Sequence, residues 1–211
     1  MSLNIGLLTK KLGMTHLFDF NSNHITVTIL KAPYSIITNI IKSKIDLSCK
    51  LVVSSWQLNF SRLKKIKKAR LSLFDKKKFP VFNFTKEYFN FLPLSINIGE
   101  VICLNVFKNE QTINASGKSI GKGFTGNIKR HGFSRGPMSH GSKHHRLQGS
   151  LGAGTTPGRV FPGKKMSGQS GNKNVTIKNL PILKLDLENN LIYLKGAVPG
   201  KKNNLVHIKN H

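Results

Sequence analysis

Lysine, arginine and glycine are interspersed along one stretch of this 211-residue chain, between Glu110 and Asp186. The stretch contains 13 Lys and Arg and 14 of the 19 glycines, and no acidic residue lies within it. Cations spaced by glycine bind phosphate well, because glycine lets the backbone approach closely and present its N–H donors. These charges have no acidic neighbours to pair with, so the pattern predicts a nucleic-acid backbone as the partner.

The candidate contacts with nucleic acid are basic side chains and two histidines, which donate to phosphates or stack on bases. They are Lys118, Lys122, Lys129, Arg130, Arg135, Lys143, His144, His145, Arg146, Arg159, Lys164, Lys165 and Lys173. Phe124, Phe133 and Phe161 lie between the charges, where they either stack on unpaired bases or anchor the segment to its own domain.

A glycine motif, GKGFTG at residues 121–126, matches the Gly-x-Gly-x-x-Gly pattern of dinucleotide-binding folds. That pattern requires a following helix and an acidic residue about twenty positions later to hold the ribose. The next acidic residue here is Asp186, and Gly132 and Gly136 would interrupt a helix. We therefore expect no cofactor.

Metal binding and catalysis lack their usual side chains. His140, His144 and His145 are close in sequence, but no Cys, Asp or Glu is near enough to complete a zinc site. Gly141 and Ser142 also disfavour the helix that would align these imidazoles. Nucleases need clustered carboxylates for their metal ions, and a Ser–His pair needs an acid to orient it. The sequence predicts no metal site and no enzyme.

The whole chain is strongly basic, with 34 Lys and Arg against 8 Asp and Glu and a net charge of +26. A charge of this size attracts polyanions over long distances. The chain has no apolar run of 18 residues, so it lacks an ordinary membrane helix. We expect nucleic acid as the partner, and no membrane, small-molecule substrate or homo-oligomer.

Strand patterns flank the basic stretch and must hold its two ends. The simplest architecture is mainly β, a Greek-key-like β-barrel or a sandwich built from residues 1–116 and 175–211, with 117–174 as one long loop. The first two and the fifth and sixth of the predicted strands would form hairpins. The predicted strands are Met14–Phe20, Ile25–Lys31, Leu51–Ser55, Val101–Phe107, 183–187, Leu191–Lys195 and Leu205–Lys209.

The region between about residues 60 and 95 is predicted to be a variable basic and Phe-rich insert. Arg62–Lys78 holds nine Lys and Arg opposed only by Asp75. Its apolar spacing predicts a short helix, and a solvated helix or loop and an accessory RNA contact carry equal weight. Phe79–Leu92 is expected to be an insert packed on the main sheet.

Several motifs resemble the universal ribosomal protein L-three family, in the same order along the chain. The opening segment IGLLTKKLGMT (5–15) resembles the start of the family. The resemblance continues with GKGF (121–124), KRHGF (129–133), SHGSKHHR (139–146), GSLG (149–152), TPGRVFPGKKM (156–166), GQ (168–169), VT (175–176) and KGAVPG (195–200). It covers both ends and nearly all of 117–200, and is loose between about 35 and 95.

The resemblance implies a structural protein of the large ribosomal subunit, of the bacterial or plastid-like organellar type. It implies a β-barrel on the solvent side, an early role in subunit assembly, and contacts with large-subunit rRNA and neighbouring ribosomal proteins. The loop 117–174 would penetrate the rRNA, with its tip approaching the peptidyl transferase centre. The tip maps to Gly152, Ala153, Gly154, Thr155, Thr156 and Pro157.

Two positions depart from the family pattern. Ile120 stands where members often have a second lysine, and Lys118 lies two positions upstream. Thr155 stands where some bacterial members have a glutamine that is methylated in certain species.

The alternative function is a free nucleic-acid-binding protein, such as a nucleoid factor or RNA chaperone.

Codon bias points to the compartment in which the chain works. Lys outnumbers Arg 28 to 6, which indicates an AT-rich genome. The N-terminus lacks the pattern of a transit peptide. We expect a ribosome in a reduced plastid, with a mitochondrion or the cytoplasm of an AT-rich bacterium as alternatives.

Overall fold

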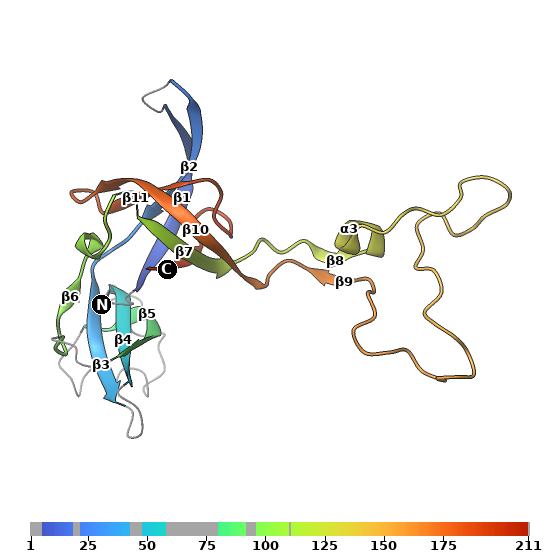
Figure 1. Cartoon of the computed structure of the whole chain (residues 1–211), viewed down its shortest axis with the longest axis horizontal. Coiled ribbons are helices and arrows are strands. Elements are labelled where there is room, and N and C mark those ends of the chain that lie inside the picture. The colour runs from blue at the N-terminus through green and yellow to red at the C-terminus, as the bar shows by residue number, and fades with distance from the viewer. Residues whose placement is uncertain are drawn as a thin grey trace. The chain divides into compact units, whose positions relative to one another are not determined.

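The structure is a computed structural model that describes residues 6–18, 22–42, 48–57, 80–91, 96–109 and 111–210. Its architecture is mainly β, as predicted. Two compact units divide the chain. The barrel unit comprises the residues up to Lys118 and those from Asn174 onward, and the basic loop comprises Ser119–Lys173 (Figure 1).

Six described strands close an antiparallel barrel in the order β1-β12-β7-β10-β11-β2. Alternation drives this closure: Ile113 and Ala115 of β7 and Val206 and Ile208 of β12 are all fully buried, and the polar residues between them, Asn114 and His207, lie on the opposite face of the sheet. The bounds are β1 (Gly6–Phe18), β2 (His24–Lys31), β7 (Thr112–Lys118), β10 (Asn174–Asp186), β11 (Leu191–Lys195) and β12 (Leu205–Asn210). The Greek-key arrangement stays a prediction.

The two predicted hairpins are confirmed. Strand β1 pairs with β2 from Lys10 opposite Lys31 to Phe18 opposite His24, and β10 pairs with β11 as far as Asp186 opposite Leu191. Both pairs alternate apolar and polar residues along their strands, which is the pattern that sets a hairpin register. The predicted last strand is confirmed as β12.

A second antiparallel sheet has the order β5-β4-β3-β6. Its strands are β3 (Ser35–Lys42), β4 (Ser48–Gln57), β5 (Phe82–Phe91) and β6 (Val101–Ile102). Strand β4 contains the predicted run Leu51–Ser55. Within the predicted insert Phe79–Leu92, β5 is a regular strand paired with β4, since Phe and Tyr favour strands and Pro80 lies before its first residue.

The predicted strand Val101–Phe107 is only partly correct. It stops at Ile102, and a 3-10 turn follows at Leu104–Val106. Leu104 and Phe107 are both buried. Residues three apart share one side of a 3-10 turn, whereas a strand would have placed these two on opposite faces.

One hydrophobic core joins the barrel to the second sheet. Leu30 and Ile192 from the barrel belong to the same buried cluster as Ile37, Leu51 and Tyr88 from the sheet. The four aliphatic side chains among these are fully buried, and each such side chain stabilises the fold by about 1.5–3 kcal/mol. Tyr88 of β5 also stacks on His207 of β12, on the outer face of the barrel.

The basic loop contains little regular structure. Its elements are β8 (Gly123–Thr125), β9 (Gly168–Ser170) and the short helix α3 (Asn127–His131). Strand β8 pairs with β9, with Phe124 opposite Gln169. The predicted helix within Arg62–Lys78 lies outside the described residues.

Candidate nucleic-acid interface

Backbone pairing closes the base of the basic loop. The Ser119 amide donates to the Lys173 carbonyl at 2.9 Å, and the Lys173 amide donates to Ser119 Oγ at 3.2 Å. Further along, the Lys122 amide donates to the Ser170 carbonyl at 2.9 Å. Lys122 and Lys173 therefore project from a paired stem whose backbone position is set, and both side chains are exposed.

Helix α3 places one basic residue against the returning segment that precedes β9 (Gly168–Ser170). The Arg130 guanidinium donates to the Met166 carbonyl, and His131 Nε2 lies 3.0 Å from the same oxygen. The helix ends where Gly132 adopts a left-handed conformation with φ of 72°, which glycine does without steric cost. Arg130 is half-buried and thus holds the loop together as well as carrying charge.

The histidine cluster lies in a turn, and no helix forms there, as expected from Gly141 and Ser142. The Gly136 amide donates to the His145 carbonyl at 3.0 Å, and His145 Nδ1 lies 3.0 Å from the Pro137 carbonyl. A Cβ on Gly136 would lie 2.1 Å from the His144 carbonyl oxygen, so only glycine fits. The turn leaves the His144 side chain exposed and His145 half-buried.

The predicted tip, 152–157, is exposed at every residue. The Gly158 amide donates to the Gly154 carbonyl at 3.1 Å and closes a turn over Thr155 and Thr156. Its side chains are small or are hydroxyls, so another backbone can approach the tip closely.

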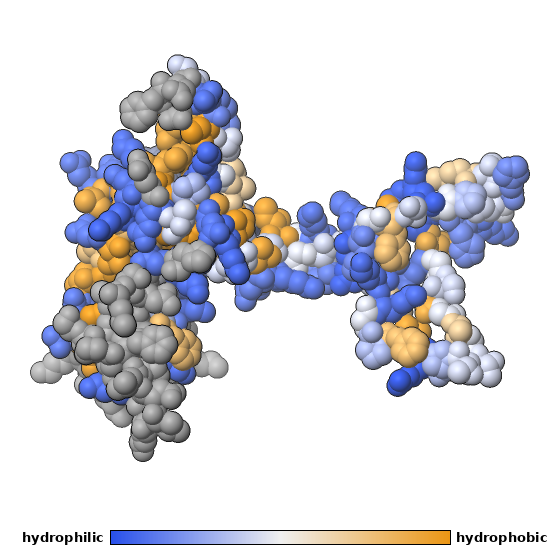
Figure 2. Space-filling model, in the orientation of Figure 1, coloured by the Kyte–Doolittle hydropathy of each residue, from blue (hydrophilic) through white to orange (hydrophobic). Residues whose placement is uncertain are grey.

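The loop has charge and apolar groups on its surface and no hydrophobic interior. Every buried hydrophobic side chain of the described structure belongs to the barrel unit. Of the thirteen predicted contacts, all but Arg130 and His145 are exposed. Figure 2 shows hydrophobic residues set among hydrophilic ones over the loop. The exposed hydrophobic residues are Ile120, Phe124, Phe133, Met138, Leu147, Leu151, Val160 and Phe161.

Phe124 and Phe161 are the most exposed of the loop phenylalanines. Their side chains are 79% and 59% exposed. Arg159 lies over the Phe161 ring, with 5.9 Å from the guanidinium carbon to the ring centroid. Exposed aromatic rings beside cations are suited to stacking on unpaired bases.

Sequence reasoning missed Asn127, the first residue of α3. It is 4% exposed, and neither atom of its amide group has a hydrogen-bond partner among the described residues. A buried amide without a partner costs about 1–3 kcal/mol. Its only sequence signal is an Asn directly after Gly126 at a helix start.

The described part of the chain contains neither a metal-ligand cluster nor a membrane-spanning helix. No group of three or more His, Cys, Asp or Glu side chains is placed to hold a metal ion there. None of the helices described has the length and apolar character needed to cross a membrane.

Comparison with known proteins shows to which family this chain belongs. The family model for ribosomal protein L3 matches residues 81–188, a range that includes the whole basic loop. The chain belongs to the ribosomal protein L3 family. Relatives extend the similarity to almost the full length. "Large ribosomal subunit protein uL3c" of Gracilaria tenuistipitata var. liui is 48% identical, over 98% of this chain and 99% of the relative.

Two further members of the L3 family show the same full-length match. The uL3c protein of Porphyra purpurea is 45% identical over 98% of this chain and 99% of its own length. "Large ribosomal subunit protein uL3" of Prochlorococcus marinus (strain MIT 9312) is 44% identical over 98% of this chain and 94% of its own. Of the two departures noted from the L3 pattern, Ile120 is 58% exposed and Thr155 is also exposed.

Proposed function

We propose that this chain is a structural constituent of the large subunit of a plastid ribosome and binds large-subunit rRNA through its basic loop. The observation that carries the proposal is the loop itself. It has exposed cations, exposed aromatic rings, no acidic residue and no hydrophobic core of its own. Membership in the L3 family and the algal and cyanobacterial relatives support the ribosome and its compartment.

The stem and the basic side chains would act together on rRNA. The paired stem presents Lys122 and Lys173 to phosphates from a fixed backbone, and Lys164 and Lys165 add charge on the returning segment. Phe124 and Phe161 would stack on splayed bases. Asn127 would recover the hydrogen bonds that its buried amide lacks within the chain.

The tip, 152–157, would lie deepest in the rRNA and approach the peptidyl transferase centre. Small side chains there let RNA backbones pack closely. The loop would take up its RNA partners early in subunit assembly, because a segment without its own core must be surrounded before the RNA around it closes. The role is structural and not catalytic, and neighbouring ribosomal proteins would contact the barrel unit.

Sedimentation tests this function. The chain is expected to co-sediment with large subunits through a moderate salt wash and to be absent from free-protein fractions. A chain found outside ribosomal particles and bound to duplex DNA would instead be a free nucleic-acid-binding protein, contrary to the proposal.

A further inference from the structure

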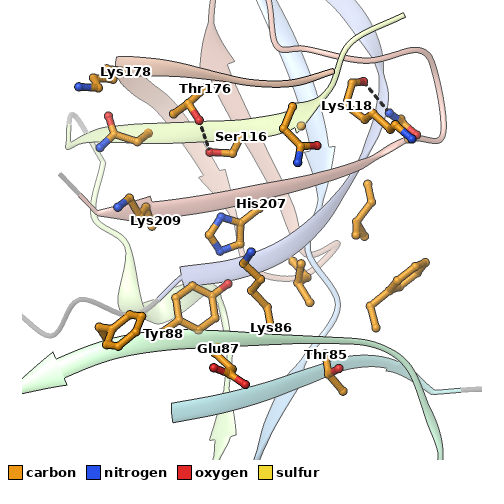
Figure 3. Close-up of a pocket in the computed structure, with 18 residues that line it drawn as sticks. Thr85, Lys86, Glu87, Tyr88, Ser116, Lys118, Thr176, Lys178, His207 and Lys209 are labelled. Atoms are coloured by element: carbon orange, nitrogen blue, oxygen red, sulfur yellow. Dashed lines mark hydrogen bonds between the residues drawn. The ribbon is translucent and has the colours of Figure 1, made fainter. Parts of the chain in front are cut away.

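A groove of about 900 Å³ lies in the barrel unit between the outer face of the barrel and β5 (Figure 3). Side chains that neighbouring strands of the barrel direct outward, at every second residue, form the barrel side of the groove. Ser116 of β7 lies between Thr176 of β10 and His207 of β12, and the Ser116 and Thr176 hydroxyls are hydrogen-bonded at 2.8 Å. Strand β5 is an edge strand of its sheet and forms the opposite side.

The groove is strongly basic. Lys86 of β5 and Lys118, Lys178 and Lys209 of β7, β10 and β12 are among the residues that line it (Figure 3). None of the four forms a salt bridge with a described residue. The one carboxylate in its lining, Glu87, pairs with Lys50 outside it at 3.7 Å. Four positive charges are thus left for an external anion.

Aromatic rings line the same groove. Tyr88 stacks on His207 with ring centroids 5.0 Å apart. Burial, and then the charges of Lys86 and Lys209, lower the pKa of His207 to about 4, so its ring is neutral at pH 7. Phe89 is 62% exposed, and Lys50 Nζ lies 4.9 Å from the centroid of its ring. The groove lining therefore includes phosphate-binding charge and an exposed aromatic ring that already carries one cation.

We propose that this groove binds a single-stranded RNA segment, with its phosphates at the four lysines and a base on Phe89. A base can stack on a protein ring only when it is unpaired, which favours a single strand over a duplex. Lys118 is the last residue of β7 before the basic loop begins, so the groove continues the predicted RNA contacts along the chain. The inference rests on the proposed function and adds Lys86, Lys178, Lys209 and Phe89 to its contacts.

The test uses the full-length chain and a large-subunit rRNA transcript that carries 4-thiouridine for photo-crosslinking. Cross-links are expected in the peptide that contains residues 82–91. The triple variant Lys86→Gln, Lys178→Gln, Lys209→Gln should lower the slope of log affinity against log salt by about 2, at roughly 0.7 per phosphate contact on a single strand. Phe89→Ala should weaken binding about tenfold.

A control variant removes the same charge elsewhere, through Lys184→Gln, Lys201→Gln and Lys202→Gln. It should leave the cross-links in β5 intact, and thermal melting checks that both triple variants fold. Cross-links confined to the basic loop, with equal slopes for the two variants, would overturn the groove proposal and leave the proposed function standing. Normal binding of the transcript but loss of the groove variant from assembled subunits would point to an acidic protein tail and also overturn it. A wild-type chain that fails to co-sediment with large subunits defeats the proposed function instead.

Discussion

Four exposed lysines of the basic loop provide the sharpest prediction, since each can be neutralised without touching a hydrophobic contact. The variant replaces Lys122, Lys129, Lys164 and Lys165 with glutamine. Each lysine that neutralises a phosphate contributes about 0.7–0.9 to the salt slope of RNA affinity, so four of them contribute about 3. Over a fourfold rise in salt, wild-type affinity should therefore fall about 60-fold more than that of the variant.

Filter binding or fluorescence anisotropy with a large-subunit rRNA transcript, across a salt series, measures this slope. The matched control carries four Lys→Gln changes on the barrel unit, at exposed residues outside the groove. These are Lys184, Lys195, Lys201 and Lys202. Equal slope changes in the two variants would mean that only net charge attracts the RNA, and the assignment of contacts to the loop would be refuted.

The remaining predictions concern stability and the order of the loop. His207 takes up a proton below about pH 6.5 in the unfolded chain but only below about pH 4 in the folded chain. The free energy of unfolding, measured by urea denaturation, should therefore fall by at most about 3 kcal/mol as the pH is lowered from 6.5 to 4. His207→Gln should make this free energy less dependent on pH. Gly6→Ala should destabilise the fold by several kcal/mol, because its Cβ would lie 2.3 Å from the Tyr88 ring and 2.4 Å from a backbone oxygen. The control is Gly13→Ala on the same strand, whose Cβ would meet nothing within 4 Å. Equal melting temperatures for the two variants would contradict this prediction. Arg130→Ala removes the hydrogen bond to the Met166 carbonyl and should speed proteolysis of the free loop, with no change in barrel melting.

The sequence predicted those parts of the fold whose signals are local. The β1–β2 and β10–β11 hairpins keep the alternation of apolar and polar residues along their strands, so their pairing could be predicted. Strand β3 was missed because a bulge between Ile37 and Asn39 shifts the alternation along an isoleucine-rich run.

The basic loop and the groove also differ in whether a local sequence signal marks them. The loop is recognisable from composition alone, because its charge and glycine content are contiguous in sequence. The groove depends on Lys86, Lys178 and Lys209, which come from three strands and meet only when β5 packs against the outer face of the barrel. No local pattern marks these lysines, so only the fold reveals that they share a surface.

The central claim is that rRNA surrounds the basic loop in the large subunit. Limited trypsin digestion of the free protein and of purified large subunits, with fragments identified by mass spectrometry, tests this claim most directly. Cleavage is expected after Lys122, Lys143 and Arg159 in the free chain, where these side chains are exposed, and all three sites should be protected within the subunit. Equal cleavage in both samples would contradict it.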